Sequence, residues 1–140
     1  MDNVEILLFD EPLANLDPAA GKRTISLIDE ISRDQKVTVL IIEHRIEDVL
    51  YKDVDRIIVI NDGRILADAR PDELLCSDVL MEQGMREPLY VTAIKHAGCR
   101  IRPEDRPQHI EEMNLEPYRG AVLNWFENTP APPARPAARP

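Results

Sequence analysis

Residues 4–11 read VEILLFDE and residues 37–44 read VTVLIIEH, and these two stretches decide the fold. Each is a short apolar run that ends in charged side chains, a pattern typical of a strand buried on both faces of a parallel sheet. Between the two runs, Asp17-Pro18 predicts a helix start, because Asp is a good N-cap and Pro is favoured at the first helical position. A strand, a helix and a second strand within about 40 residues predict a βαβ unit with a right-handed crossover.

The remaining patterns continue this reading along the chain. The predicted helix should run to about residues 34–35, with one apolar face marked by Ile25, Ile28 and Ile31, together with Leu27. Residues 56–67 predict a β-hairpin with its turn on Asp62-Gly63. A short helix is expected between the second strand and the hairpin, at 46–50. Beyond the hairpin, helical patterns are expected at 71–75, 79–83, 88–97 and 115–126.

The ends of the two strands carry the residues that suggest chemistry. Asp10 and Glu11 follow the first apolar run, and His44 follows the second. Because parallel strands end on one edge of a sheet, and ligands bind at that edge in open α/β sheets, the three residues should lie close together. Phosphoryl transfer needs a cation ligand and a group that orients the attacking water, and Asp10 and Glu11 could serve in these roles. The simpler alternative is a solvated acidic turn after a strand.

Three blocks, in this order and spacing, resemble the C-terminal half of the ABC-type nucleotide-binding domain: ILLFDEP at 6–12, ANLD at 14–17 and IIEH at 41–44. The resemblance implies an α/β fold, namely part of a P-loop NTPase-type sheet followed by a β-hairpin and a C-terminal helical extension. It also implies ATP and Mg²⁺ as cofactors. By the same resemblance Asp10 would hold Mg²⁺ through water, Glu11 would polarise the attacking water, and His44 would contact the γ-phosphate.

The resemblance also implies partners. Asn15, Leu16 and Asp17 match the D-loop, which would touch a second ATPase cassette. The wider sequence, with the hairpin INDGRILAD at 60–68 and REPLYVTAIKHAGC at 86–99, resembles the ATP-binding subunit of energy-coupling-factor importers of vitamins or thiamine precursors. Such a subunit works at the cytoplasmic face of the membrane with a transmembrane coupling subunit and a substrate-binding membrane subunit.

Two motifs of a complete cassette are missing from the 140 residues. There is no G-x-x-x-x-G-K-[ST] loop, and there is no Gly-Gly pair that an LSGGQ-like signature would need. Gly21-Lys22 is not such a loop, because Arg23 follows where Ser or Thr is required and the pair lies inside the predicted helix. We therefore expect no meaningful ATP hydrolysis by this chain alone, and a marginal fold with an exposed sheet edge.

The predicted organisation has three parts. Residues 1–70 would form the C-terminal half of the cassette, and residues 71–128 the helical extension. Residues 129–140, TPAPPARPAARP, would form a flexible linker, because alternating Pro, Ala and Arg cannot build an apolar face. No stretch resembles a transmembrane helix or a signal peptide, and Cys76 and Cys99 are expected to be reduced thiols.

The formal net charge of −9 argues against a nucleic-acid partner, which would require a basic face. Two alternatives to an importer ATPase remain open: a non-catalytic interaction module, and a cassette ATPase that acts on DNA or ribosomes. Arg45 and Arg64 are expected to be solvated surface charges, and the sequence suggests no role for His96 or His109.

Overall fold

The computed structural model describes residues 5–129, so the linker expected at 129–140 lies outside the described residues except for Thr129. Helices and strands alternate at first, and helices follow. In chain order the elements are β1 (Ile6–Asp10), α1 (Pro18–Gln35), β2 (Thr38–Ile42), α2 (Ile46–Val49), β3 (Ile57–Asn61), β4 (Arg64–Ala69), α3 (Pro71–Cys76), α4 (Val79–Glu82), α5 (Leu89–His96), the 3₁₀ turn η1 (Pro103–Asp105) and α6 (Glu116–Asn128).

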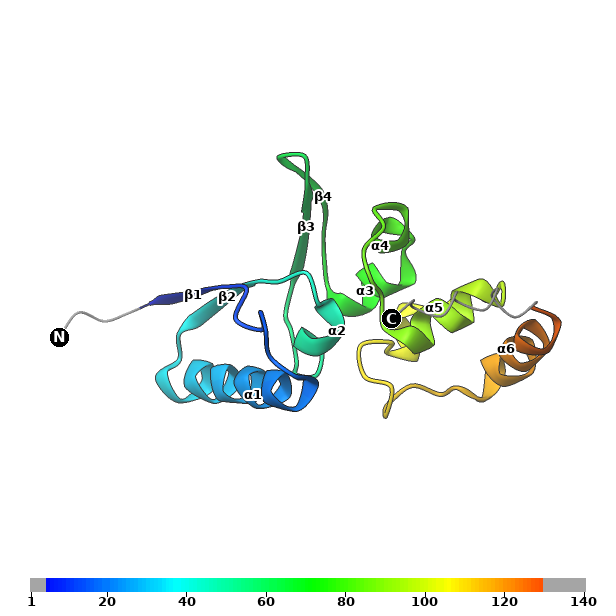
Figure 1. The fold of residues 1–140 in the computed structure, drawn as a ribbon, viewed down its shortest axis with the longest axis horizontal. Helices are drawn as coiled ribbons and strands as arrows, with labels where there is room; N and C mark the ends of the chain where they lie inside the picture. The colour runs from blue at the N-terminus through cyan, green and yellow to red at the C-terminus, as the bar shows by residue number, and fades with distance from the viewer. Residues whose placement is uncertain (1–4, 130–140) are drawn as a thin grey trace, which may run out of the picture.

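The predicted βαβ unit is present. β1 and β2 pair in parallel, from Ile6 opposite Thr38 to Asp10 opposite Ile42. α1 connects the two strands and lies along one face of the pair (Figure 1). Asp17 and Pro18 begin the helix as expected, and Lys36 ends it in a left-handed conformation with its N–H donating to the carbonyl of Ser32.

Only one face of this two-stranded sheet is covered within the described chain. Side chains alternate along both strands, so Phe9, Val39 and Ile41 pack against a buried cluster of Leu13, Ile25 and Ile28. The opposite face is exposed and apolar; it consists of Ile6, Leu8, Leu40 and Ile42. Burial on both faces, expected from the apolar runs, is therefore not found, because no element among residues 5–129 covers the second face.

The apolar face of α1 also differs in one residue from the prediction. Ile25 and Ile28 are buried and Ile31 is half-buried, but Leu27 is 56% exposed. Leu27 lies only one residue before Ile28, a step of about 100° around a helix, and this places it off the stripe that faces the sheet.

The predicted hairpin is confirmed. β3 and β4 pair antiparallel, and the turn residues Asp62 and Gly63 have φ values of 48° and 70°. Two positive φ values suit the twist of a tight hairpin, and Asp-Gly accepts them readily. The hairpin extends away from the other elements at its turn (Figure 1). Val59, in the middle of β3, packs with Leu50, Leu74, Leu75 and Leu80.

α5, α6 and the segment between them form a separate cluster around Val91, Ile94, Ile101, Met113 and Tyr118. α6 lies at the end of the molecule farthest from β1 (Figure 1). No helix within residues 5–129 combines the length and the apolar character needed to cross a membrane.

Residues 107–109 join this helical part to the loop after α2. Gln108 Nε2 donates to the carbonyl of Lys52, and its N–H donates to a carboxylate oxygen of Asp72. His109 Nε2 lies 2.9 Å from Asp53 Oδ1. His96 stacks on Trp125 with ring centroids 5.7 Å apart. Both histidines thus have partners that the sequence did not indicate.

The described chain therefore contains helices and two small sheets, one parallel and one antiparallel. Two strands of a parallel sheet are too few to identify a P-loop NTPase-type sheet, and that part of the fold class stays a prediction.

Candidate functional site at the carboxyl edge of β1 and β2

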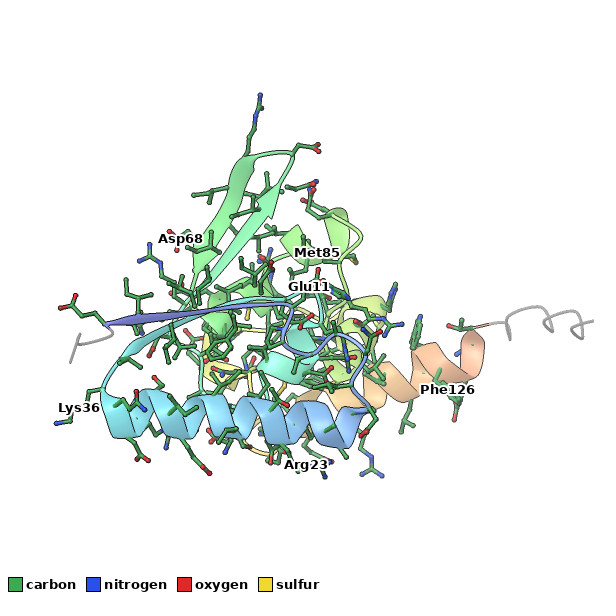
Figure 2. The ribbon with its side chains drawn as sticks, turned by 60° about the vertical axis from the view of Figure 1, so that its left-hand side comes forward. Glu11, Arg23, Lys36, Asp68, Met85 and Phe126 are labelled. Carbon is green, nitrogen blue, oxygen red and sulfur yellow. The ribbon has the colours of Figure 1, made fainter. Side chains whose placement is uncertain are left out.

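The strand register brings the predicted site residues to one edge. Asp10, the last residue of β1, pairs with Ile42, the last residue of β2, and the N–H of Glu11 donates to the carbonyl of Ile42 at 2.9 Å. His44 follows two residues later. Figure 2 shows Glu11 at the carboxyl end of β1, while Lys36 marks the opposite end of the sheet. The shared edge is thus a consequence of the parallel pairing.

The three side chains do not contact one another. Asp10, Glu11 and His44 are all exposed, and no hydrogen bond or ion pair joins them among residues 5–129. Glu11 has a φ of 45°, a left-handed conformation that is unusual for a residue with a long side chain. The chain therefore turns sharply away from the sheet at Glu11 and leaves its carboxylate in solvent, where a ligand could reach it.

The loop after Glu11 is anchored by one leucine. Leu13 is fully buried against Ile25 and Ile28, and Leu16 packs half-buried beside it. The carbonyl of Glu11 accepts from Ala14 N–H at 3.0 Å, and the carbonyl of Leu13 accepts from Leu16 N–H at 3.2 Å. Asn15, with a φ of 62°, lies exposed at the tip. Of the three predicted D-loop residues, Asn15 and Asp17 are thus exposed to solvent, whereas Leu16 packs inward.

Asp17 caps α1, as the sequence predicted. Its Oδ1 accepts from the N–H groups of Ala19 and Ala20, both at 2.9 Å. The hydrogen bond from Ala20 is the largest influence that lowers the pKa of the Asp17 carboxyl below its ordinary value, and the bond from Ala19 and the charge of Arg23 act in the same direction.

Glu43 is a site residue that the sequence analysis missed. Its side chain is 3% exposed. Oε1 accepts from the N–H of His44 at 2.9 Å and of Arg45 at 3.2 Å, and Oε2 accepts from the N–H of Leu13 at 3.3 Å. His44 Nδ1 also lies 3.2 Å from Oε1. The available signal was a carboxylate directly after an apolar strand, since a carboxylate that becomes buried there requires hydrogen-bond donors.

Arg45 corrects a prediction. It is not a solvated surface charge, because its side chain is 29% exposed and its Nη1 donates to the carbonyls of Leu13 at 3.2 Å and Leu16 at 3.4 Å. Its Nη2 lies 2.5 Å from Asp48 Oδ2, although the two groups are not aligned as a hydrogen bond. The sequence could not place Arg45, because its partners are backbone carbonyls of a loop about thirty residues earlier.

The donor set at this edge allows only a partial metal site. Among residues 5–129 no group of three or more His, Cys, Asp or Glu side chains is arranged to hold a metal ion. Mg²⁺ commonly binds one or two carboxylates and completes its shell with water and substrate phosphates. The exposed carboxylate of Asp10 fits that lesser requirement, so Asp10 could hold the ion only together with a phosphate ligand.

Comparisons with known proteins agree on one class. Residues 77–140 match a family described as an ATP-binding cassette cobalt transporter. A relative from Vibrio vulnificus (strain CMCP6), which bears the name of an ABC transporter ATP-binding protein, is 56% identical over 90% of this chain. Relatives with the same description from Vibrio parahaemolyticus and Clostridium perfringens are both 51% identical, over 98% and 91% of this chain respectively.

This chain covers only about a fifth to a quarter of each of these relatives: 22%, 24% and 22% of their lengths. The match to the Vibrio parahaemolyticus relative spans 138 of the 140 residues, so it includes both the strand-edge site and the helices that follow it. The comparisons support an ABC-type ATP-binding domain as the class of protein.

Proposed function

We propose that this chain supplies the hydrolytic edge of an ABC transporter ATPase, in which Glu11 polarises the attacking water, His44 contacts the γ-phosphate and Asp10 holds Mg²⁺ through water. The observation that carries the proposal is the parallel register of β1 and β2. It sets Asp10 opposite Ile42 and binds Glu11 N–H to the Ile42 carbonyl, so that two exposed carboxylates and a histidine end at one edge.

The exposure of these side chains supports the assignment. A carboxylate that acts on a bound nucleotide must be free of permanent partners, and Glu11 has none among the described residues. Glu43, by contrast, is buried and fully engaged. Of the two glutamates that follow these strands, only Glu11 is available to water.

The second part of the proposal concerns partners. Asn15 and Asp17 are exposed on a loop that the buried Leu13 side chain anchors. This geometry is suited to contact with a second ATPase cassette. A transmembrane coupling subunit and a substrate-binding membrane subunit complete the proposed assembly, which places this chain peripherally at the cytoplasmic face. We further propose that the chain by itself does not hydrolyse ATP, because its sequence contains no G-x-x-x-x-G-K-[ST] motif to bind the phosphates.

A chimera tests the hydrolytic role. In the Vibrio vulnificus relative, this chain replaces the matching segment, and the ATPase rates of the chimera and the unmodified relative are compared. We expect comparable rates in both, loss of at least about 100-fold in the chimera with Glu11→Gln, and no effect of Glu30→Gln on the exposed side of α1. A Glu11→Gln chimera that hydrolyses ATP at the normal rate would refute the assignment.

Two solutes compete for the transport role. The resemblance to energy-coupling-factor importers favours a vitamin or thiamine precursor, whereas the family matched by residues 77–140 is described as a cobalt transporter. Uptake of labelled thiamine precursor and of cobalt by cells that produce this chain with its own membrane subunits, with and without Glu11→Gln, separates them. The solute whose uptake depends on Glu11 is the one transported.

A further inference from the structure

The backbone of Leu13 is held from both sides by the residues that flank His44. Its N–H donates to Glu43 Oε2 at 3.3 Å, and its carbonyl accepts from Arg45 Nη1 at 3.2 Å. We propose that Glu43 and Arg45 are positioning residues, which fix the loop of residues 13–16 to the segment that carries His44. The proposal rests on the proposed function, because it concerns how the same site is held in place.

The Glu43 carboxylate uses both oxygens as acceptors. Oε1 binds the N–H groups of His44 and Arg45, and Oε2 binds the N–H of Leu13, thirty residues away in sequence. A carboxylate that is 3% exposed persists only when donors replace its lost hydration. These three backbone donors belong to two different segments, so the burial of Glu43 joins the two segments.

Arg45 completes the connection from the other direction. Its guanidinium donates to the carbonyls of Leu13 and Leu16, and it also lies against Asp48 at the start of α2. Both carbonyls accept from Nη1, while Nη2 lies beside Asp48, so one planar guanidinium spans the loop and α2 at once. A lysine ammonium on a flexible chain does this less well. Hydrogen bonds to the backbone of the loop thus add to the anchoring that the buried Leu13 side chain provides.

The consequence for the site is geometric. Leu13 lies two residues after Glu11, and His44 lies between Glu43 and Arg45. The strand pairing and the bond from Glu11 N–H to the Ile42 carbonyl bring Glu11 and His44 to one edge. Fixing Leu13 to both neighbours of His44 adds a further restraint on their separation. The 3.2 Å approach of His44 Nδ1 to Glu43 Oε1 also limits the orientation of the imidazole ring. A displacement of about 1 Å at a reacting group can cost roughly 100-fold in rate.

Glu43→Gln is the sharpest structural test. The amide keeps the size of the side chain but has one acceptor oxygen, so its NH₂ group must face an N–H donor on one side or the other. We expect the peptide covering residues 11–17 to exchange its amide hydrogens about tenfold faster, as measured by mass spectrometry on the 140-residue chain and on the chimera.

Glu47→Gln is the matched control. It removes the same charge four residues away, and the Glu47 carboxylate has no hydrogen bond or ion pair among residues 5–129. Its exchange pattern should equal that of the unsubstituted protein. Equal exchange of residues 11–17 in the Glu43→Gln and Glu47→Gln proteins would overturn the proposal.

Kinetics of the chimera separate positioning from mere stability. We expect Glu43→Gln to lower kcat about tenfold with little change in KM for ATP at a temperature where the protein stays folded. Arg45→Lys should retain more activity than Arg45→Met, because it keeps a donor for one carbonyl. Equal kcat values in the Glu43→Gln, Glu47→Gln and unsubstituted chimeras would contradict a positioning role.

The proposed function and the positioning role can be refuted independently of each other. If Glu11→Gln leaves ATP hydrolysis intact, the proposed function fails, while faster exchange of residues 11–17 in Glu43→Gln still confirms the connection itself. If Glu11→Gln abolishes hydrolysis but Glu43→Gln changes neither exchange nor kcat, the proposed function stands and the positioning role is wrong.

Discussion

Glu11 and Glu43 follow neighbouring strands at the same edge, yet their surroundings differ completely. Glu11 stands on a left-handed backbone and projects into solvent, whereas Glu43 is buried with hydrogen bonds to three backbone N–H groups. The first is available to a ligand, and the second holds the loop that presents it. The difference comes from the backbone around each residue, because the two side chains are chemically identical.

Asp17 provides a prediction at this scale. Asp17→Ala removes the acceptor of two N–H groups at the start of α1 and should lower the melting temperature by a few degrees, while Asp17→Asn should retain most of the stability. Because the folded-state pKa of Asp17 is lowered from 3.8, its contribution is present above that value and is lost as pH falls through the folded pKa. Thermal melts at pH 7 and pH 2.5 check this prediction. Equal melting temperatures of Asp17→Ala and the unsubstituted protein at pH 7 would contradict it.

Cys76 provides a second prediction. Burial, followed by the charges of Asp72 and Asp105, raises the pKa of its thiol from 9.0 to about 11. At pH 8 the reactive thiolate should therefore be about 100-fold scarcer than in an unperturbed cysteine. Mass spectrometry of iodoacetamide labelling should show slow reaction of Cys76 in the folded chain and fast reaction in urea. Equal rates in the two conditions would refute the shift.

The sequence predicted the edge placement of Asp10, Glu11 and His44 because topology alone determines it once the strands are parallel. It could not predict the contacts of Glu43 and Arg45, because these depend on where the backbone of residues 13–16 lies in space. Local chemistry predicted the Asp17 cap, since its partners are two and three residues away. The contact between His109 and Asp53 was not predicted for the same reason, because the two residues are far apart in the sequence.

Within the helix α1, two neighbouring apolar side chains differ sharply in exposure. Ile28 is 5% exposed beneath the sheet, and its neighbour Leu27 is 56% exposed. The spacing of the isoleucines predicted the stripe correctly, and the inclusion of Leu27 was wrong because a helix turns about 100° per residue.

The pair of residues gives a matched test. Ile28→Ala should destabilise the chain by about 3 kcal/mol, because it opens a cavity against Leu13 and Ile25. Leu27→Ala should change stability by less than about 0.5 kcal/mol. Urea denaturation followed by circular dichroism measures both, and similar losses in the two variants would contradict the orientation of α1.

A side-chain hydrogen bond adds to the apolar packing that docks α6. The Tyr118 hydroxyl donates to Asp105 Oδ2 in η1. Burial, and then this bond, raise the pKa of Tyr118 to about 12, while the bond to Tyr118 is the main influence that lowers the pKa of Asp105. The pair therefore stabilises most strongly between the ordinary carboxyl and phenol ranges. Its contribution falls as the pH drops through the folded Asp105 pKa or rises from 10 toward 12.

Tyr118→Phe tests this contact. It should cost about 1 kcal/mol near pH 7, and the difference between the two proteins should shrink at pH 11 and above. Tyr51→Phe is the control, because Tyr51 is 47% exposed. Urea denaturation across this pH range provides the measurement, and a pH-independent difference would contradict the pairing.

For the whole molecule, the exposed apolar face of β1 and β2 is the dominant feature. Ile6, Leu8, Leu40 and Ile42 are between 46% and 65% exposed on one continuous face. The sequence predicted apolar strands, and it predicted an exposed edge for the chain by itself. What it could not give is which face remains open, because that depends on the side on which α1 packs.

This face predicts self-association of the chain when it is produced alone. Sedimentation velocity should show association that increases with concentration, and Leu8→Lys together with Ile42→Lys should shift the chain toward monomer. Leu27→Lys, which charges an isolated exposed leucine on α1, should have no such effect. A chain that is fully monomeric at high concentration would contradict the prediction.

In the proposed function, Glu11 acts in ATP cleavage and not in ATP binding. The most direct measurement incubates the chimera with labelled ATP, isolates the protein and identifies the nucleotide that it retains. We predict that the unsubstituted chimera yields ADP, and that Glu11→Gln retains uncleaved ATP with its affinity intact. Equal conversion to ADP by both proteins would contradict the account.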